Sequence, residues 1–318
     1  MKIGPLACSV SLILTFLLSV LLWSADSNRA AIGYSTEGVL RITTESGRVL
    51  HSFETKPPIG DFAISPDGRS VVFSPFGTDY GGPLYLMNVA NGKTDLLVQD
   101  RYYVQGEVYS DPDFSPDGER IVFAIHGRSK GDLVEASGPF AVIDLRTKKV
   151  NVLPATMNVD GGGVAFANEP VWSPDGRMVL LNFESDAGIV DASGKTLKML
   201  SSIISSNEGP WLHGIGWIGT GCVVYAAGTD QREAYRLPAR AVNLRTLKTV
   251  PANELLGLPA TSLTEVAAFS VPIRIRTIEQ TRVVESPTSS WRVPARDPLH
   301  TIIRLVHQED SQIPQACK

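Results

Sequence analysis

The sequence predicts an all-β protein built as a β-propeller, and three observations support this prediction. A nine-residue pattern occurs three times, as SPDGRSVVF at 65–73, SPDGERIVF at 115–123 and SPDGRMVLL at 173–181. Each copy is followed by two further apolar runs that are separated by a tight turn. The glycines of the three copies are 50 and 58 residues apart, which is typical of four-stranded blades stacked around an axis.

The SPDG motif itself predicts a β-hairpin. Proline presets the φ angle that a tight turn needs, aspartate accepts hydrogen bonds from nearby amides, and glycine tolerates positive φ. An apolar residue precedes each motif, and β-branched or other apolar residues follow it, as in a strand–turn–strand unit. We therefore expect an architectural role for nine turn residues: Pro66, Asp67, Gly68, Pro116, Asp117, Gly118, Pro174, Asp175 and Gly176.

The rest of each repeat predicts two more strands. We expect them at 84–89 and 94–98, at 140–145 and 150–153, and at 188–191 and 196–200. A degenerate fourth copy begins with WIGTG at 217–221, where the turn has lost its proline and aspartate. The strand after this turn is out of step by one residue, and the closing strands are expected at 241–244 and 248–250.

The two ends of the chain are expected to complete one blade together. Residues 39–43 and 49–53 resemble the last two strands of a blade, and 266–278 and 282–285 have strand character near the other end. Pairing of C-terminal strands with the N-terminal hairpin would close the ring. At about 45 residues per blade, the propeller at 31–310 has room for six four-stranded blades, with five or seven as alternatives.

The first 27 residues predict export. Lys2 precedes an apolar run over 10–23, which has the length of a signal peptide and is short for a membrane span of roughly 20 residues. Cleavage near Ala25 is favoured over an uncleaved N-terminal anchor. Either outcome places the remaining chain in the periplasm or another extracytoplasmic space, and membrane contact is expected only through an uncleaved N-terminus. Residues 311–318 form a polar tail.

Composition excludes several classes of function. The net charge of −4 gives no basis for nucleic-acid binding. The five histidines are scattered singly, so we expect neither a metal site nor a cofactor. Cys222 and Cys317 could pair in an oxidising compartment, but we expect a buried free Cys222 and a loose Cys317.

Strand order places the long loops together on one face, opposite the compact SPDG turns. Rigid scaffolds commonly carry function on such loops, and aromatic and arginine side chains often anchor protein interfaces there. The alternative is that these aromatic residues pack between blades. The candidate binding residues are Tyr80, Arg101, Tyr102, Tyr103, Tyr109, His126, Arg128, Trp211, His213, Arg232 and Tyr235.

A carboxylate recurs at one position of the repeat. Asp61, Asp111 and Glu169 each lie three residues before the apolar residue that precedes SPDG, near the start of an innermost strand. At the channel mouth they would form a partial acidic ring that could bind a cation or a basic segment of a partner. Alternatively, each carboxylate caps nearby backbone amides. The fourth copy has Gly214 at this place, next to His213.

The repeats resemble the WD-like repeats of the TolB family. FSPDGERIVF at 114–123 and WSPDGRMVLL at 172–181 carry the resemblance, which covers 59–200 and extends more weakly to 250. It implies a propeller in the periplasm with a role in the cell envelope. TolB has an α/β domain before its propeller, and we expect no counterpart, because only about a dozen residues separate the leader from the first strand.

Three functions are compatible with this pattern. The first is an exported, monomeric scaffold that binds an envelope protein or peptide through its long-loop face. The second is a propeller hydrolase or lyase acting on peptide or polysaccharide; GRSKG at 127–131 matches the G-x-S-x-G pattern, but no helix is expected after it. The third is a degenerate structural propeller. Binding is favoured, and no catalytic residue is assigned.

Overall fold

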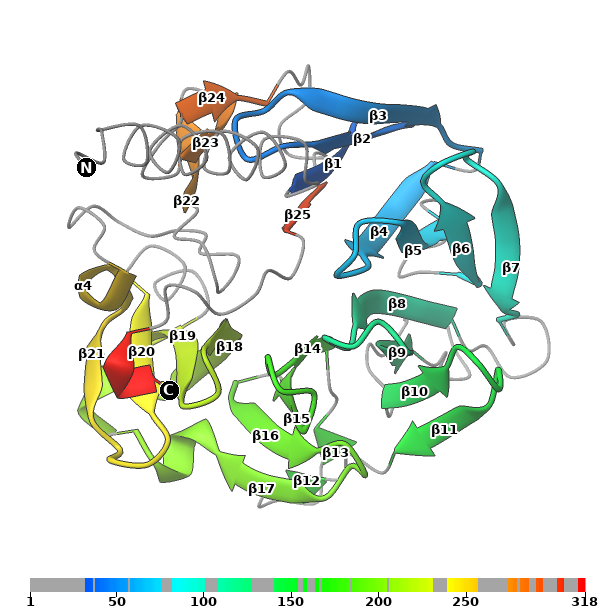
Figure 1. Ribbon diagram of the computed structural model, residues 1–318. Coiled ribbons are helices and arrows are strands. Elements are labelled where there is room, and N and C mark those ends of the chain that lie inside the picture. The colour runs from blue at the N-terminus through cyan, green and yellow to red at the C-terminus, as the bar shows by residue number, and fades with distance from the viewer. Residues whose placement is uncertain are drawn as a thin grey trace, which may run out of the picture.

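The computed structural model describes residues 32–36, 38–56, 58–75, 82–100, 108–126, 140–153, 157–158, 164–165, 168–183, 185–204, 206–230, 239–256, 274–278, 281–285, 290–293, 302–305 and 314–317. Within these residues the strands form five four-stranded antiparallel sheets, one three-stranded sheet and one two-stranded sheet. Figure 1 shows the larger sheets arranged around a common centre. The protein is therefore all-β, with the sheet arrangement of a propeller.

Three consecutive sheets begin with the SPDG hairpins. Their strands are β4 (Ile59–Ile64), β5 (Ser70–Pro75), β6 (Leu84–Asn88) and β7 (Thr94–Val98); β8 (Val108–Phe114), β9 (Arg120–His126), β10 (Phe140–Asp144) and β11 (Val150–Leu153); and β14 (Asn168–Trp172), β15 (Met178–Asn182), β16 (Ala187–Asp191) and β17 (Thr196–Met199). The first two strands of each sheet pair across the motif, which confirms the predicted strand–turn–strand unit.

The degenerate fourth copy forms a sheet of the same order. Its strands are β18 (Trp211–Ile218), β19 (Cys222–Gly228), β20 (Arg240–Asn243) and β21 (Thr249–Pro251). The short helix α4 (Ala252–Leu256) follows, and η1 (Leu200–Ser202) and η2 (Ser206–Glu208) precede β18. The pair β12 (Met157–Asn158) and β13 (Val164–Ala165) lies between the second and third SPDG sheets in the chain. In Figure 1 the first strands β4, β8, β14 and β18 lie nearest the centre.

The three SPDG turns share one hydrogen-bonding pattern. The serine Oγ donates to the aspartate two residues later, at 2.5 to 2.7 Å. The same Oγ accepts the amide that begins the second strand, at 2.9 Å in all three copies. The aspartate also accepts the amide of the residue after the glycine, and the glycine φ is between 66° and 71°. The turns are therefore closed by the side chains that the motif repeats.

The two ends of the chain pair in one sheet, as expected. β25 (Ile302–Leu305) pairs with β1 (Ile32–Thr36), which leads through β2 (Val39–Thr43) to β3 (Val49–Glu54). The prediction that strands within 266–285 complete this sheet is wrong, because Ile32–Thr36 supplies a third N-terminal strand and β25 is the C-terminal strand that completes the sheet.

The remaining C-terminal strands form a sheet of their own. β22 (Arg274–Ile278), β23 (Thr281–Glu285) and β24 (Ser290–Arg292) pair in that order, beside β1–β3 in Figure 1. Within the described part of the chain, no helix has the length and apolar character that a membrane crossing requires.

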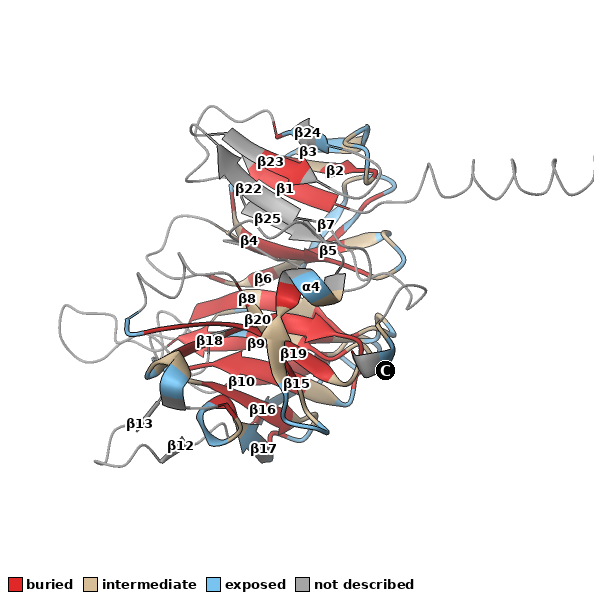
Figure 2. Cartoon of the chain, turned by 90° about the vertical axis from the view of Figure 1, so that its left-hand side faces the viewer, coloured by how far each residue is buried: buried red, intermediate tan, exposed pale blue. Residues whose placement is uncertain are grey.

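Apolar side chains and a few polar contacts join neighbouring sheets. Trp172 is fully buried among residues of the β8–β11 and β14–β17 sheets. The Arg120 guanidinium lies over the Trp172 ring, 4.7 Å from its centroid, and donates to the Gly176 carbonyl at 3.2 Å. Trp217 Nε1 donates to the Val171 carbonyl at 3.1 Å across the next boundary. Figure 2 shows that buried residues run through the strands, while exposed residues lie mainly at turns.

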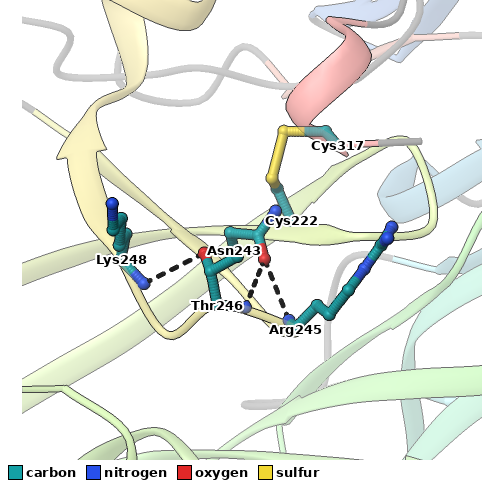
Figure 3. The surroundings of a disulfide bond; sticks show 6 residues. All are labelled: Cys222, Asn243, Arg245, Thr246, Lys248 and Cys317. Carbon is teal, nitrogen blue, oxygen red and sulfur yellow. Dashed lines mark hydrogen bonds between the residues drawn. A yellow bond between two sulfur atoms is a disulfide. The ribbon is translucent and has the colours of Figure 1, made fainter.

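Cys222 and Cys317 form a disulfide, so the expectation of two free thiols is wrong. Both residues are buried, and their Cα atoms are 5.1 Å apart. The C-terminal turn η4 (Gln315–Cys317) packs at the start of β19. Figure 3 shows the bonded sulfur atoms and, next to them, the turn between β20 and β21. The sequence does not reveal this pairing, because the cysteines are 95 residues apart and the tail has no strand or turn pattern that places it.

Candidate functional site

The predicted carboxylates lie at or directly after β-bulges in the inner strands. In β8 the bulge contains Asp111 and Pro112, and in β14 it contains Glu169 and Pro170. In β4 the register shifts immediately before Asp61. Bulges redirect side chains and are frequent next to functional sites. Each carboxylate lies four residues before the serine of its own SPDG turn.

Asp111 and Glu169 also share an unusual backbone conformation, with φ of 48° and 47°. Few residues other than glycine adopt positive φ, and a following proline disfavours helical conformations further. Such conformations cost on the order of 1–3 kcal/mol each and concentrate at functional sites. The same strained position in two successive repeats makes this end of the inner strands the candidate site.

Asp111 belongs to a largely buried polar cluster at the β8–β9 edge. Ser110 Oγ donates to Asp111 Oδ2 at 2.7 Å and lies 2.5 Å from His126 Nε2. His126 Nε2 is also 3.9 Å from Asp111 Oδ2. Asp61 lies on the neighbouring strand β4, and its Oδ1 accepts the amide of Phe62 at 2.8 Å. Asp61 therefore caps a backbone amide, as the alternative describes, whereas Asp111 interacts mainly with the side chains around it.

This cluster contains serine, histidine and aspartate but does not have the geometry of a catalytic triad. In a triad the serine and the carboxylate bind opposite nitrogens of the imidazole, so that the carboxylate fixes the tautomer that accepts the serine proton. Here Ser110 Oγ and Asp111 Oδ2 both approach Nε2 of His126. The arrangement stabilises an ionised Asp111 and does not activate Ser110 as a nucleophile.

The pKa of Asp111 shows the effect of these neighbours. Burial alone would raise it, but hydrogen bonds with His126, Ser110 and Asp61, together with the charge of His126, lower the pKa from 3.8 to about 2.

Acid should therefore destabilise the parent protein more steeply than the Asp111→Asn variant. Because the folded-state pKa of Asp111 is below its ordinary value of 3.8, its contribution is complete above pH about 4 and is lost as the pH falls towards 2. The contribution is on the order of 2 kcal/mol. Urea unfolding of both proteins at pH 7, 4 and 2.5 measures this contribution to the free energy of unfolding. Asparagine is the chosen replacement because it tolerates the positive φ of this position. Parallel pH profiles would contradict the assignment.

Glu169 lies in a second cluster, which joins the β14–β17 and β18–β21 sheets. Its Oε2 is 2.9 Å from Nε2 of His213 and accepts from Asn182 Nδ2 at 3.3 Å. Asn182 also binds the backbone of Gly214, accepting its amide at 2.6 Å and donating to its carbonyl at 2.9 Å. A Cβ at Gly214 would lie 2.8 Å from the Leu180 side chain. This close packing explains why the fourth repeat has no carboxylate here.

Glu169 is the accessible member of the three carboxylates. Its side chain is 52% exposed, and that of His213 is 13% exposed. The indole ring of Trp211 stacks on the His213 ring, with centroids 5.5 Å apart and an interplanar angle of 8°. An exposed carboxylate, an imidazole and an indole are thus held together at the starts of β14 and β18. This combination of negative charge and aromatic surface suits a cationic group.

The segment before β18 is fixed by a second set of charged and polar groups. Glu208 in η2 pairs with Arg240 at 3.1 Å and accepts hydrogen bonds from Thr249, at 3.2 Å, and from Tyr225. Burial is the main cause of a raised pKa for the Tyr225 hydroxyl, and the Glu208 carboxylate raises it further. These contacts hold η2, and therefore the start of β18 with Trp211, against the sheet.

The structure places the remaining candidates in different surroundings. Tyr109 is buried and packs edge-on against Phe123, at 5.2 Å between ring centroids, so its assignment to an exposed binding face is corrected. His126 is also buried, while Trp211 and His213 are partly accessible. The GRSKG segment and the following candidates lie outside the described residues: Tyr80, Arg101, Tyr102, Tyr103, Arg128, Arg232 and Tyr235.

Two residues of the site were not among the sequence candidates. Ser110 and Asn182 connect the carboxylates to their partners, but short polar residues are common in strands and carry no distinctive pattern. His213 beside the missing carboxylate at Gly214 is the one signal that could have suggested its contact with Glu169.

Comparisons with known proteins agree with the fold. No protein-family model and no curated protein matches the sequence. Among solved structures, TolB from Acinetobacter baumannii superimposes with a TM-score of 0.57 and 14% identity, covering 89% of this chain and 68% of that one. An oligogalacturonate lyase in complex with manganese gives a TM-score of 0.42 and 13% identity, covering 87% of this chain and 73% of that one. The likeness to the TolB structure extends to the fold alone, and the likeness to the lyase structure is too distant to support an argument. The resemblance of the SPDG repeats to the TolB family stays a prediction.

Proposed function

We propose that this protein is an exported six-bladed β-propeller that binds a basic segment of an envelope protein or peptide at the mouth formed by its inner strands. The sixth blade is the β22–β24 sheet, and pairing of β25 with β1 closes the ring. The observation that carries the proposal is the Glu169–His213–Trp211 group. Its accessible carboxylate is held by two neighbours, so little side-chain freedom is lost when a cationic group binds.

Export is supported by two independent features. Residues 1–27 have the charge and apolar pattern of a signal peptide. The Cys222–Cys317 disulfide fits an oxidising compartment such as the periplasm, since disulfides are rare in reducing cytosol. An uncleaved leader would leave the propeller anchored to the membrane on the same side.

The basic-segment proposal predicts that Glu169→Gln weakens binding of a cationic peptide. The substitution keeps the size of the side chain and removes its charge, so we expect a five- to tenfold loss of affinity, or about 1 to 1.4 kcal/mol. The matched control is Glu119→Gln, an exposed carboxylate beside an SPDG turn at the opposite end of the strands. Fluorescence anisotropy with labelled Lys–Gly, Arg–Gly and Glu–Gly repeat peptides of equal length measures the effect.

The outcomes separate the candidate functions. Binding of the two basic peptides, weakened by Glu169→Gln and by added salt but not by Glu119→Gln, supports the proposal. Equal binding of all three peptides, or equal effects of the two substitutions, would contradict it. Failure of the parent to bind any of them would leave the degenerate structural propeller as the better account.

A further inference from the structure

The fourth repeat differs from the others at its first turn. In all four sheets, the residue directly after the third strand donates a backbone hydrogen bond, at 2.8 to 3.0 Å, to the carbonyl of the residue that ends this turn. The four accepting residues therefore occupy equivalent positions of the repeat. They are Arg69, Glu119, Arg177 and Gly221. The residue that follows each of them begins the second strand. The loss of one residue from the fourth turn accounts for the strand being out of step in the sequence.

The amide at this equivalent position always has an acceptor, but the acceptor changes. In the SPDG turns it is the aspartate carboxylate, at 2.9 to 3.1 Å. In the fourth turn, which has no aspartate, the Gly221 amide donates to the carbonyl of Cys317 at 2.9 Å. The next residue, Cys222, is joined to the same Cys317 by the disulfide. The C-terminal segment thus occupies the place of the missing carboxylate.

The second turn of the fourth repeat has not changed in this way. At the equivalent place in all four sheets, an Asn or Asp side chain accepts a hydrogen bond from a backbone amide of the turn. The accepting residues are Asn88, Asp144, Asp191 and Asn243. Figure 3 shows Asn243 accepting the amides of Arg245 and Thr246 next to the disulfide. The loss of the acidic residue is therefore confined to the turn on which the tail docks.

We infer that the C-terminal segment 314–317 is a redox-dependent clasp that replaces the turn aspartate of the fourth repeat. The clasp closes when Cys222 and Cys317 transfer two electrons and two protons to a disulfide oxidant by thiol–disulfide exchange. One thiolate attacks the oxidant, the second thiolate attacks the mixed disulfide, and the oxidant leaves as two thiols. Reduction opens the clasp, and the Gly221 amide then loses its acceptor.

Hydrogen exchange of the parent protein tests the clasp directly. Oxidised glutathione is the oxidant and dithiothreitol the reductant. We expect exchange at the Gly221 amide to accelerate at least tenfold on reduction, while the Glu119 amide, which binds Asp117, is unchanged. Equal protection of Gly221 in both redox states would overturn the inference, as would free thiols at Cys222 and Cys317 in the parent after oxidation.

Gly221→Ala separates docking of the tail from the chemistry of the cysteines. The φ of Gly221 lies outside the positive range, so alanine fits the backbone, but its Cβ would lie 2.9 Å from the Cys317 carbonyl oxygen. Under conditions that oxidise Cys222 and Cys317 of the parent, we expect this variant to retain two more titratable thiols than the parent. Glu119→Ala, at the equivalent position where no tail docks, should oxidise like the parent. The clasp would be contradicted if Gly221→Ala oxidised like the parent and its residue 221 amide stayed fully protected from hydrogen exchange. If the variant does not fold, the comparison of the oxidised and reduced parent protein decides between the outcomes.

Discussion

Replacement of Trp172 by alanine should lower the free energy of unfolding by about 3 to 5 kcal/mol. The indole is completely buried between the β8–β11 and β14–β17 sheets, and packs with Val122, Phe140 and Val179. Its removal leaves a cavity between sheets and also deprives the Arg120 guanidinium of the ring over which it lies. Urea unfolding followed by far-UV circular dichroism measures the loss.

Trp172→Phe is the matched control, because it keeps an aromatic ring at the same site. Trp172 Nε1 is buried and has no hydrogen-bond partner among the described residues, so phenylalanine removes volume without breaking such a bond. The expected cost is about 1 to 2 kcal/mol. A loss for alanine no larger than that for phenylalanine would show that the sheets do not depend on this contact.

Loss of the Cys222–Cys317 disulfide should cost about 2 to 5 kcal/mol. The bond spans 95 residues, so it restricts a long segment of the unfolded chain and also holds the C-terminal turn against β19. Unfolding of the Cys222→Ala/Cys317→Ala variant, compared with the oxidised parent, measures the effect. Addition of reductant to the parent should reproduce most of the loss and should leave the variant unchanged. Equal stability of all three forms would contradict a structural role for the bond.

The sequence predicts the hairpins well because the SPDG chemistry is local. Serine, proline, aspartate and glycine close each turn through contacts within five residues, so the motif and its flanking apolar runs suffice to place β4, β5, β8 and β9. The strand Ile32–Thr36 was missed because it follows the leader and has no such turn beside it. Its place in the sheet depends on pairing with β25, almost the full length of the chain away.

The candidate site was predicted only in part. Asp61, Asp111 and Glu169 recur at one position of the repeat, and each lies within the first strand of its sheet. Their different surroundings depend on bulges and on the register between sheets, which a single sequence does not encode locally. Tyr109 was assigned to the surface because residue type alone does not distinguish an interface tyrosine from one packed in a core.

The measurement that tests the central claim most directly is carbodiimide cross-linking of the bound Lys–Gly peptide, followed by peptide mapping. This reagent joins an amine to a carboxylate only where the two are in contact. The account predicts a cross-link at Glu169 that disappears in Glu169→Gln and in high salt. Cross-links confined to carboxylates on the SPDG-turn side, such as Glu119 and Asp95, would show that the mouth of the inner strands is not where a basic segment binds.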